Sequence, residues 1–253
     1  MHRYFIKLSY CGTNYNGWQV QENTPKTIQE VLTKNVSGLL NEELSIVGCG
    51  RTDTGVHAKE FYAHFDSGKD DLHVAPSVWL YKMNCVLPND IVIHEVIPVK
   101  ADASARFSAL ERTYQYVINR KRDPFLIDRA YSLYVPLDID KMNKASQILL
   151  EYTDFSSFSK TNTQVKNNEC RIVRAGWEEK GDLFIFTITA NRFLRNMVRA
   201  IVGTLIDVGK GVTSEEELRK IIEGKNRSDA GSSVPAGGLY LTKVIYPPDI
   251  FIS

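Results

Sequence analysis

The sequence predicts an α+β protein built from two subdomains. Runs with apolar residues at alternate positions, as in strands, are interspersed with runs in which apolar residues recur every three or four positions, as in helices. Each half of the chain contains three or four of the former and about two of the latter. The length of 253 residues suits one large domain or two ordinary ones. We expect two subdomains, residues 1–104 and 105–253, that meet near residues 101–107.

The first half is predicted to alternate strands with helices. Residues 3–10 carry large apolar side chains in alternation, as a strand does. Pro25 and Thr27 are residue types that often begin helices, and they precede apolar residues at helical spacing over 28–40. The remaining elements predicted here are strands at 44–50, 61–65 and 91–99 and a short helix at 75–87.

The second half repeats this rhythm without a visible sequence repeat. A strand is predicted at 112–119, and a helix at 138–152 with Asp138 or Asp140 as its cap. Residues 170–190 predict a hairpin that turns near Gly181. Further predicted elements are a long helix at 193–208, a helix at 214–224 and a strand at 238–246.

Composition and charge exclude several classes of protein. Hydrophobic residues make up 43% and charged residues 24%, the balance of a soluble globular protein. The net charge is +1, so bulk charge identifies no partner and an anion site requires local clustering. Four cysteines without Cys-x-x-Cys spacing favour reduced thiols in a cytoplasmic protein, without a zinc site. The first ten residues are too polar for a secretory signal, and no membrane span is expected.

The segment CGRTDTGVHA, residues 49–58, places one carboxylate, Asp53, between Arg51 and His57. Asp and Gly are common in ordinary turns, but apolar runs on both sides place this loop at a sheet end, where catalytic residues often lie. Asp-Thr-Gly is also the triplet of aspartic proteases, whose mechanism requires a second carboxylate. The chain has no second triplet, and Arg51 would keep the acid ionised. A lone ionised aspartate can act as a nucleophile or general base.

Three arginines lie at the start of the long predicted helix. Arg192, Arg195 and Arg199 stand three and four residues apart, so we expect them to share one stripe of that helix. A solvated basic face is the ordinary interpretation. Like charges at this spacing repel, however, and phosphates or one buried carboxylate would offset the repulsion.

Other cations are interleaved with aromatic residues, a combination that favours a nucleic-acid surface. The cations fall in or beside predicted loops and strand ends: Arg106, Arg112, Arg120, Lys121, Arg122 and Lys166. The aromatic residues among them are Phe107, Tyr114 and Tyr116. Taken alone, this pattern indicates an anion-binding surface and no particular reaction.

Five motifs in series resemble the TruA-type tRNA pseudouridine synthases. In chain order they are YCGTNYNGWQVQ, GCGRTDTGVHA, ARFSALERTYQY, RFLRNMVRAIVGTLIDVG and PAGGLYL, and the similarity covers almost the whole chain. The second motif, around Asp53, is the most specific. Three positions depart from the family pattern: Cys11 replaces an acid, Thr54 an alanine, and Ser104 a His or Asp. The resemblance implies two α+β subdomains that share a mixed, mainly antiparallel sheet with a catalytic cleft between them.

The resemblance also implies roles for individual residues. Asp53 matches the nucleophile, and Arg51 an arginine that contacts the substrate backbone and helps extrude the base. Tyr114 matches the tyrosine that stacks on the target base. Arg199 matches the arginine that pairs with the nucleophile, and Leu239 an apolar residue that helps wall the pocket.

By this resemblance the protein is a cytoplasmic isomerase that converts uridine to pseudouridine at positions 38, 39 and 40 in the anticodon arm of tRNA. It is expected to act as a homodimer, without a metal or other cofactor and without a membrane. Attack on the base, attack on the sugar and removal of a sugar proton all remain open for Asp53. A tRNA-binding protein without catalysis is the alternative from another class, and the set of four matched polar residues argues against it.

Two residues near the motifs have more than one interpretation. His57 is a possible general base, but a hydrogen-bonding role in the loop is favoured because the isomerisation needs little outside proton relay. Trp18 is equally suited to contact RNA or to anchor a loop.

Overall fold

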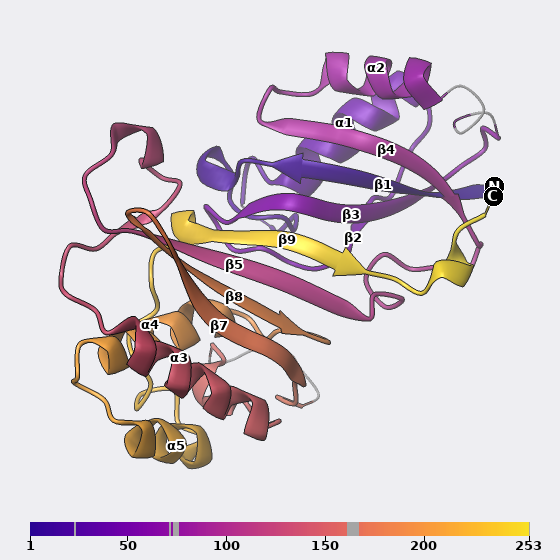
Figure 1. The fold of residues 1–253 in the computed structure, drawn as a ribbon. Coiled ribbons are helices and arrows are strands. Elements are labelled where there is room, and N and C mark those ends of the chain that lie inside the picture. The colour runs from indigo at the N-terminus through magenta and orange to yellow at the C-terminus, as the bar shows by residue number, and fades with distance from the viewer. Residues whose placement is uncertain (23, 71, 73–75, 161–166, 253) are drawn as a thin grey trace. The chain divides into compact units, whose positions relative to one another are not determined.

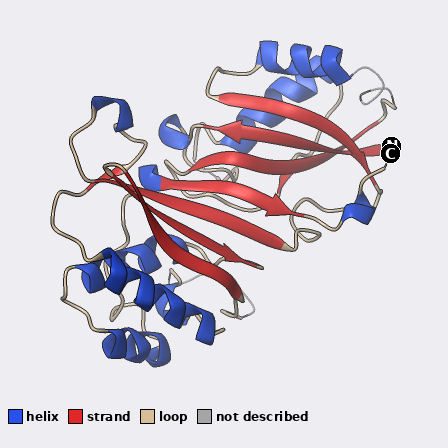
Figure 2. Cartoon of the chain, in the orientation of Figure 1, coloured by secondary structure: helices blue, strands red, loops and turns tan. Residues whose placement is uncertain are grey.

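The computed structural model describes residues 1–22, 24–70, 72, 76–160 and 167–252. The chain forms two compact units, Met1–Leu110 with Leu241–Ser253, and Glu111–Tyr240. Each unit combines helices with strands that are mostly antiparallel (Figures 1 and 2), which confirms the predicted α+β class. The subdomain division at 104/105 stays a prediction.

In the first unit the strand order is β4-β1-β3-β9, with the short β2 on β3. The strands are β1 His2–Tyr10, β2 Val47–Gly48, β3 His57–Ser67, β4 Ile91–Val99 and β9 Leu239–Ile245, whose first two residues belong to the second unit. β1 is antiparallel to both β3 and β4, so it is the inner strand of the three. Its register on β3 places Phe5 opposite His64 and Leu8 opposite Phe61.

The alternation predicted for residues 3–10 holds from Ile6 onward. Phe5, however, is fully buried next to the equally buried Ile6. Tyr246 and Phe251 explain this, because both rings pack edge-on against Phe5, with centroids 5.3 and 6.4 Å away. The C-terminal segment therefore covers a second face of β1 at this point.

Two helices, α1 Ile28–Leu40 and α2 Pro76–Val86, complete the first unit (Figure 1). Thr27 and Glu30 form a capping box, in which each side chain accepts a hydrogen bond from the other's backbone N–H. The residues buried along α1 recur at helical spacing: Ile28, Leu32, Val36 and Leu40. Both helices are where the sequence predicts them; α1 packs on α2, and α2 packs on β4.

In the second unit the strand order is β5-β8-β7, and β6 pairs with β5 in parallel. The strands are β5 Glu111–Asn119, β6 Tyr131–Ser132, β7 Ile172–Lys180 and β8 Leu183–Ala190. β7 and β8 form the predicted hairpin, with Gly181 at a φ of 59° in its turn. This left-handed conformation is one that glycine adopts without strain.

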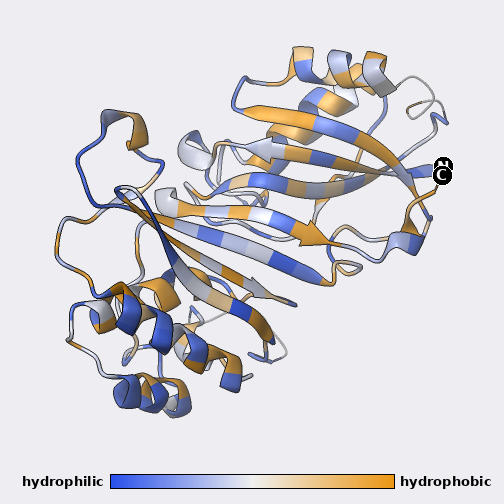
Figure 3. Cartoon of the chain, viewed as in Figure 1, coloured by the Kyte–Doolittle hydropathy of each residue, from blue (hydrophilic) through white to orange (hydrophobic). Residues whose placement is uncertain are grey.

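Three helices belong to the second unit: α3 Ile139–Ile148, α4 Met197–Gly209 and α5 Glu215–Gly224. α3 packs on α4, α5 and β7. Its cap is Asp138, whose carboxylate accepts from the Lys141 N–H at 3.0 Å, which decides between the two predicted caps. α4 is buried along most of its length, whereas α5 is largely hydrophilic (Figure 3).

Short 3-10 turns connect these elements. They are Gly12–Asn14, Pro124–Leu126, Leu149–Glu151, Ser156–Phe158, Ala236–Gly238 and Pro248–Ile250. The strand predicted over 44–50 is much shorter than expected, only Val47–Gly48, because the chain bends after Gly48 to form the loop that carries Asp53.

Candidate active site

Asp53 lies on the loop between β2 and β3. Its side chain is half-buried, and Arg51, two residues earlier, is exposed. The loop closes on itself where the Val56 N–H donates to the Asp53 carbonyl at 3.1 Å. Gly55 makes this turn possible, because its φ of 80° lies in the left-handed region that other residues enter only with strain. The backbone geometry therefore presents Asp53 at a defined turn.

The glycine-rich loop after β1 holds the Asp53 turn from both sides. The Trp18 N–H donates to the Thr52 carbonyl at 3.1 Å. The Gly55 N–H donates to the Tyr15 carbonyl at 3.3 Å. One bond lies on each side of Asp53, so the position of its backbone is fixed before any substrate binds.

Two glycines allow these segments to approach so closely. A Cβ built at Gly12 would collide with the Val56 carbonyl, and one built at Gly17 would collide with the Thr52 carbonyl. Gly17 also has a φ of 82°. No larger residue fits at either position without moving the loop that carries Asp53.

Trp18 anchors this arrangement from the core. It is 1% exposed, and its ring stacks on Phe61 with centroids 4.1 Å apart. Gly48 packs so closely against the indole that a Cβ there would collide with it. Of the two interpretations of Trp18, the anchor fits the structure, because a buried indole offers no surface to RNA.

His57 is also buried, at 2% exposure, as the first residue of β3. Its Nδ1 accepts a hydrogen bond from the Gly12 N–H at 3.0 Å. That contact ties the glycine-rich loop to β3 and occupies the lone pair of Nδ1. The favoured hydrogen-bonding role is the one that this geometry supports.

In the second unit, Tyr114 and Tyr116 occupy alternate positions of β5 and so share one face of the strand. Tyr114 is 8% exposed, and its ring packs edge-on against Phe193, with centroids 5.1 Å apart. Phe193 belongs to the segment that precedes α4. The orientation of the tyrosine ring is therefore set by that segment as well as by its own strand.

Arg199 lies in the first turn of α4 and is half-buried. Its Nε donates to the Val234 carbonyl at 2.7 Å, while the Val234 N–H donates to the Arg199 carbonyl at 3.2 Å. This pair of bonds fixes the guanidinium and the segment before β9 together. Burial raises the pKa of the Tyr116 hydroxyl, and the positive charge of Arg199 opposes that rise.

Leu239, at 6% exposure, is the first residue of β9 and directly follows the turn Ala236–Gly238. Gly238 packs against Tyr116, and a Cβ there would come within 2.8 Å of its ring. The Tyr116 hydroxyl also donates to the Pro235 carbonyl at 2.8 Å. Tyr116 thus fixes the position of the turn that directly precedes Leu239.

The predicted stripe of three arginines on one helix is wrong. α4 begins at Met197, four residues later than predicted, so Arg192 and Arg195 precede it and only Arg199 lies on the helix. Asn196 accounts for the later start, because its φ of 67° is left-handed and interrupts helical geometry. Its side-chain amide donates to Ser233 Oγ at 2.6 Å, which holds it there.

Of these three arginines, Arg192 contacts Asn191, a residue that the sequence analysis missed. Its side-chain oxygen accepts from the backbone N–H groups of Arg171 and Arg192, at 2.8 and 2.9 Å. Its carbonyl accepts from Arg112 Nη1 at 3.1 Å. The asparagine directly after the predicted strand and before Arg192 was the available signal. Asn191 therefore brings the backbones of Arg171 and Arg192 and the guanidinium of Arg112 to this end of β8, while Arg192 Nη1 donates to Asn167 Oδ1 at 3.0 Å.

The other predicted cations include Arg120 and Lys166. Arg120 pairs with Glu179 at 3.2 Å, and Lys166 lies outside the described residues.

Among the described residues no group of three or more His, Cys, Asp or Glu side chains is placed to hold a metal ion. All four cysteines are free thiols. No helix in the described part of the chain is long and apolar enough to cross a membrane.

The predicted site residues fall into two sets. Arg51 and Asp53 share one loop of the first unit. Tyr114, Arg199 and Leu239 belong to the second unit, where Tyr116 and the 234–238 segment link the last two. The pairing of Arg199 with Asp53 and the cleft between subdomains stay predictions.

Comparison with known proteins gives one consistent class. A family model described as tRNA pseudouridine synthase matches residues 145–247. "tRNA pseudouridine synthase A" of Porphyromonas gingivalis is 48% identical over 254 residues, which cover 100% of both chains. The proteins of the same name from Bacteroides fragilis and Bacillus licheniformis are 48% and 41% identical, over 99% and 94% of this chain and 99% and 97% of their own.

The α+β fold and these matches define a pseudouridine synthase. Within that class, the chain belongs to the tRNA pseudouridine synthase A family, because several relatives are more than 40% identical over nearly its full length.

Proposed function

We propose that this protein isomerises uridine to pseudouridine at positions 38, 39 and 40 in the anticodon arm of tRNA, with Asp53 as the nucleophile. Family membership carries the coarser statement, that the protein is an isomerase acting on uridine in tRNA. The observation that supports Asp53 is its place, half-buried at a turn whose backbone is bonded on both sides. A fixed carboxylate needs little reorganisation when the base arrives.

The other site residues have proposed roles in the same reaction. The target nucleotide must leave its stack, at a cost of about a few kcal/mol, before its base reaches Asp53. Arg51 is exposed and carries the charge to hold the RNA backbone as this happens. Tyr114 would stack on the extruded base, Arg199 would pair with Asp53, and Leu239 would wall the pocket.

The chemistry requires no cofactor. The glycosidic bond between uracil N1 and the sugar breaks, the uracil turns, and a bond forms between C5 and the same sugar carbon. N1 gains a proton and C5 loses one, so atoms and electrons balance within the nucleotide. We place the protein in the cytoplasm with its tRNA substrate, and we propose that it acts as a homodimer.

The test of this proposal is pseudouridine mapping on an unmodified tRNA transcript, by carbodiimide blocking and primer extension. Wild type should produce stops at positions 38–40. Asp53→Asn keeps the size and removes the charge, so product should vanish while tRNA binding is retained. Asp70→Asn, which changes an exposed acid of the same unit, is the matched control and should remain active. Product from purified Asp53→Asn would disprove the assignment of the nucleophile.

A further inference from the structure

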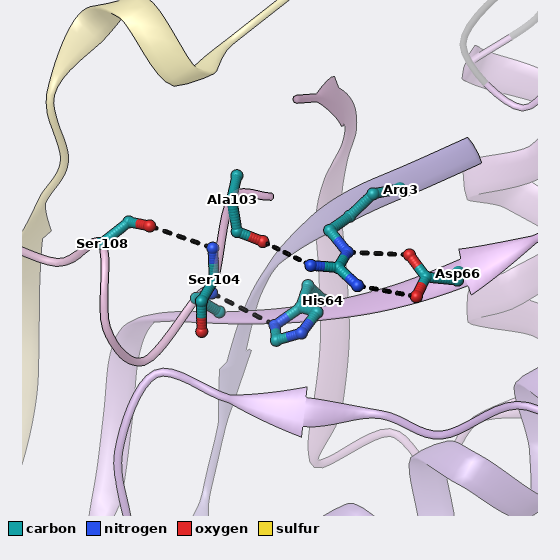
Figure 4. Close-up of polar contacts among 7 residues, drawn as sticks. Arg3, His64, Asp66, Ala103, Ser104 and Ser108 are labelled. Atoms are coloured by element: carbon teal, nitrogen blue, oxygen red, sulfur yellow. Dashed lines mark hydrogen bonds and ion pairs between the residues drawn. The ribbon is translucent and has the colours of Figure 1, made fainter. Parts of the chain in front are cut away.

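A tight turn at residues 103–109, of sequence ASARFSA, lies between β4 and β5. Its small residues point inward: Ala103 is 2% exposed and Ala105 is fully buried. Two serines close the turn on itself, because the Ser104 N–H donates to Ser108 Oγ at 3.0 Å (Figure 4) and the Ser108 N–H donates to the Ser104 carbonyl at 2.9 Å. Its backbone is therefore well defined.

Side chains from β1 and β3 hold this turn to the sheet (Figure 4). Arg3 Nη1 donates to the Ala103 carbonyl at 3.0 Å, and the same guanidinium makes two 2.8 Å bonds to Asp66. His64 Nδ1 accepts from the Ala105 N–H at 3.1 Å. These bonds satisfy buried backbone groups of the turn and leave it little freedom to move.

Tyr246, after β9, adds a third attachment. Its hydroxyl donates to the Ala105 carbonyl at 2.6 Å. Together with the bond to His64, this satisfies both backbone polar groups of Ala105. Three separate segments of the first unit thus converge on one turn.

The two large side chains of the turn point the other way. Phe107 is 81% exposed, and Arg106 is exposed beside it. The guanidinium carbon of Arg106 lies 5.2 Å from the centroid of the Phe107 ring. The turn therefore presents an aromatic ring and a guanidinium side by side to solvent.

We propose that Arg106 and Phe107 bind an unpaired nucleotide of the tRNA away from the target uridine, with the base on the Phe107 ring and the neighbouring phosphate on Arg106. The proposal rests on the proposed function. Proteins hold single-stranded RNA by stacking bases on aromatic rings while cations bind the backbone. A second copy of this chain fits less well, because Arg106 and Ser108 flank Phe107 with polar groups.

The position of the turn argues for a contact remote from the chemistry. Its anchor His64 lies seven residues along β3 from His57, which adjoins the Asp53 loop. At about 3.3 Å per residue, this is roughly 23 Å. A contact so far from the reacting base is made equally before and during the reaction. It should therefore lower the Kd and KM for tRNA without changing the rate at saturation.

The experiment measures tRNA binding and single-turnover rates of full-length variants. Phe107→Ala should raise the Kd for tRNA about 5- to 150-fold, the range expected for loss of one stacked base. Phe107→Trp should restore binding and Phe107→Leu should not, because only the former keeps an aromatic plane. Arg106→Gln should reduce the slope of log Kd against log salt by about one unit. The rate at saturating tRNA should stay at the wild-type value in all four.

Phe125→Ala is the matched control, since Phe125 is 89% exposed on a different turn, in the second unit. Melting temperatures confirm that each variant folds, as expected for exposed side chains. A Phe107→Ala Kd within twofold of that control would overturn the proposal. So would a loss of self-association in Phe107→Ala, which would assign the turn to a protein interface. If wild type makes no pseudouridine, the proposed function fails, whereas a raised Kd in Phe107→Ala would still support the RNA contact.

Discussion

Arg199 does two things at once in the second unit. Its guanidinium and its backbone carbonyl both bind Val234, so the residue joins the start of α4 to the segment that leads into Leu239. If it also pairs with Asp53, as proposed, a single side chain would connect the nucleophile to the pocket wall. The structural part of this role can be measured separately from catalysis.

Arg199→Ala should lower the free energy of unfolding by about 1–3 kcal/mol, because the Val234 carbonyl loses a charged donor. It should also abolish pseudouridine formation. Arg199→Lys should recover part of the stability and little of the activity, since an ammonium cannot reproduce the planar guanidinium. Urea denaturation and product mapping measure the two effects.

Arg174→Ala, an exposed arginine on β7, is the control and should stay within about 0.5 kcal/mol of wild type. An Arg199→Ala variant that matched this control in both stability and activity would show that the Nε bond to Val234 contributes nothing to stability and that the reaction does not need the guanidinium.

The roles of individual site residues could be predicted only through the resemblance to a known family. Asp53 stood out on its own, because its neighbours and loop position are visible in the sequence. Asn191 and Val234 did not, since each acts through backbone bonds that join residues far apart in the chain. Trp18 was undecided for the same reason: its burial depends on Phe61 and Gly48, which the sequence does not place beside it.

At the scale of elements, the loop that carries Asp53 depends on the glycine-rich loop after β1. Gly17→Ala would require both a strained left-handed conformation and movement of the Thr52 carbonyl. We expect it to destabilise the fold by about 1–3 kcal/mol and to lower activity further than that loss of stability explains. Thermal unfolding and single-turnover rates at a temperature where the variant is folded separate the two.

Gly38→Ala provides the opposite case. Gly38 lies within α1, and a Cβ there meets nothing within 4 Å. Alanine should stabilise the protein by about 0.5–1 kcal/mol and leave activity unchanged. A Gly17→Ala variant as active and stable as Gly38→Ala would mean that the close approach to Thr52 is not needed.

The contact of β1 and β3 with the 103–109 turn predicts how stability depends on pH. Burial and the charge of Arg3 lower the pKa of His64, while Asp66 opposes the shift. The unfolded chain therefore takes up this proton first, and stability should fall as pH drops below about 6.5 towards the lowered pKa. The hydrogen bond from Arg3 lowers the pKa of Asp66 in the folded protein. The ionised Asp66 therefore stabilises the fold at pH values above the usual pKa of an aspartate, and this stabilisation is lost as the pH falls towards the lowered pKa.

Urea midpoints between pH 4 and 8 test this. His64→Asn keeps an acceptor near the Ala105 N–H but does not titrate, so its midpoint should stay flat between pH 6.5 and the point where carboxylates protonate. If the wild-type midpoint were equally flat over this pH range, the protonation of His64 would not contribute to the loss of stability below pH 6.5.

Elements were predictable where local pattern and capping decide them. The capping box at Thr27 and the alternation in β7 and β8 are local, and those elements were found. The predicted start of α4 was wrong because Asn196 has a left-handed φ. Its side chain is held by a hydrogen bond to Ser233, which is 37 residues away in the sequence. β2 is shorter than predicted because the chain bends after Gly48 towards the loop that carries Asp53.

At the scale of the whole molecule, the near-neutral charge has a consequence for binding. A chain of net charge +1 offers only local groups of cations to a tRNA. We predict a homodimer whose two-fold pairing aligns the groups of both copies. Light scattering should give twice 28.7 kDa, and the affinity for tRNA should fall steeply with salt as phosphates release counterions.

An isolated anticodon stem-loop should bind less well than whole tRNA if the second protomer grips another part of the molecule. Filter binding over several salt concentrations compares the two ligands. A monomer that modified the stem-loop as efficiently as whole tRNA would refute the dimeric arrangement.

The return of Leu241–Ser253 to the first unit also affects how the protein is made. Residues 111–240, which form the second unit, are synthesised between the two parts of the first. At about 5–20 residues per second, those 130 residues take roughly 7–26 s to leave the ribosome. During that interval β3 lacks its neighbour β9, and Phe5 lacks the cover of Tyr246 and Phe251. The half of the molecule that is translated first is therefore the last to be completed, and it is the half that carries Asp53.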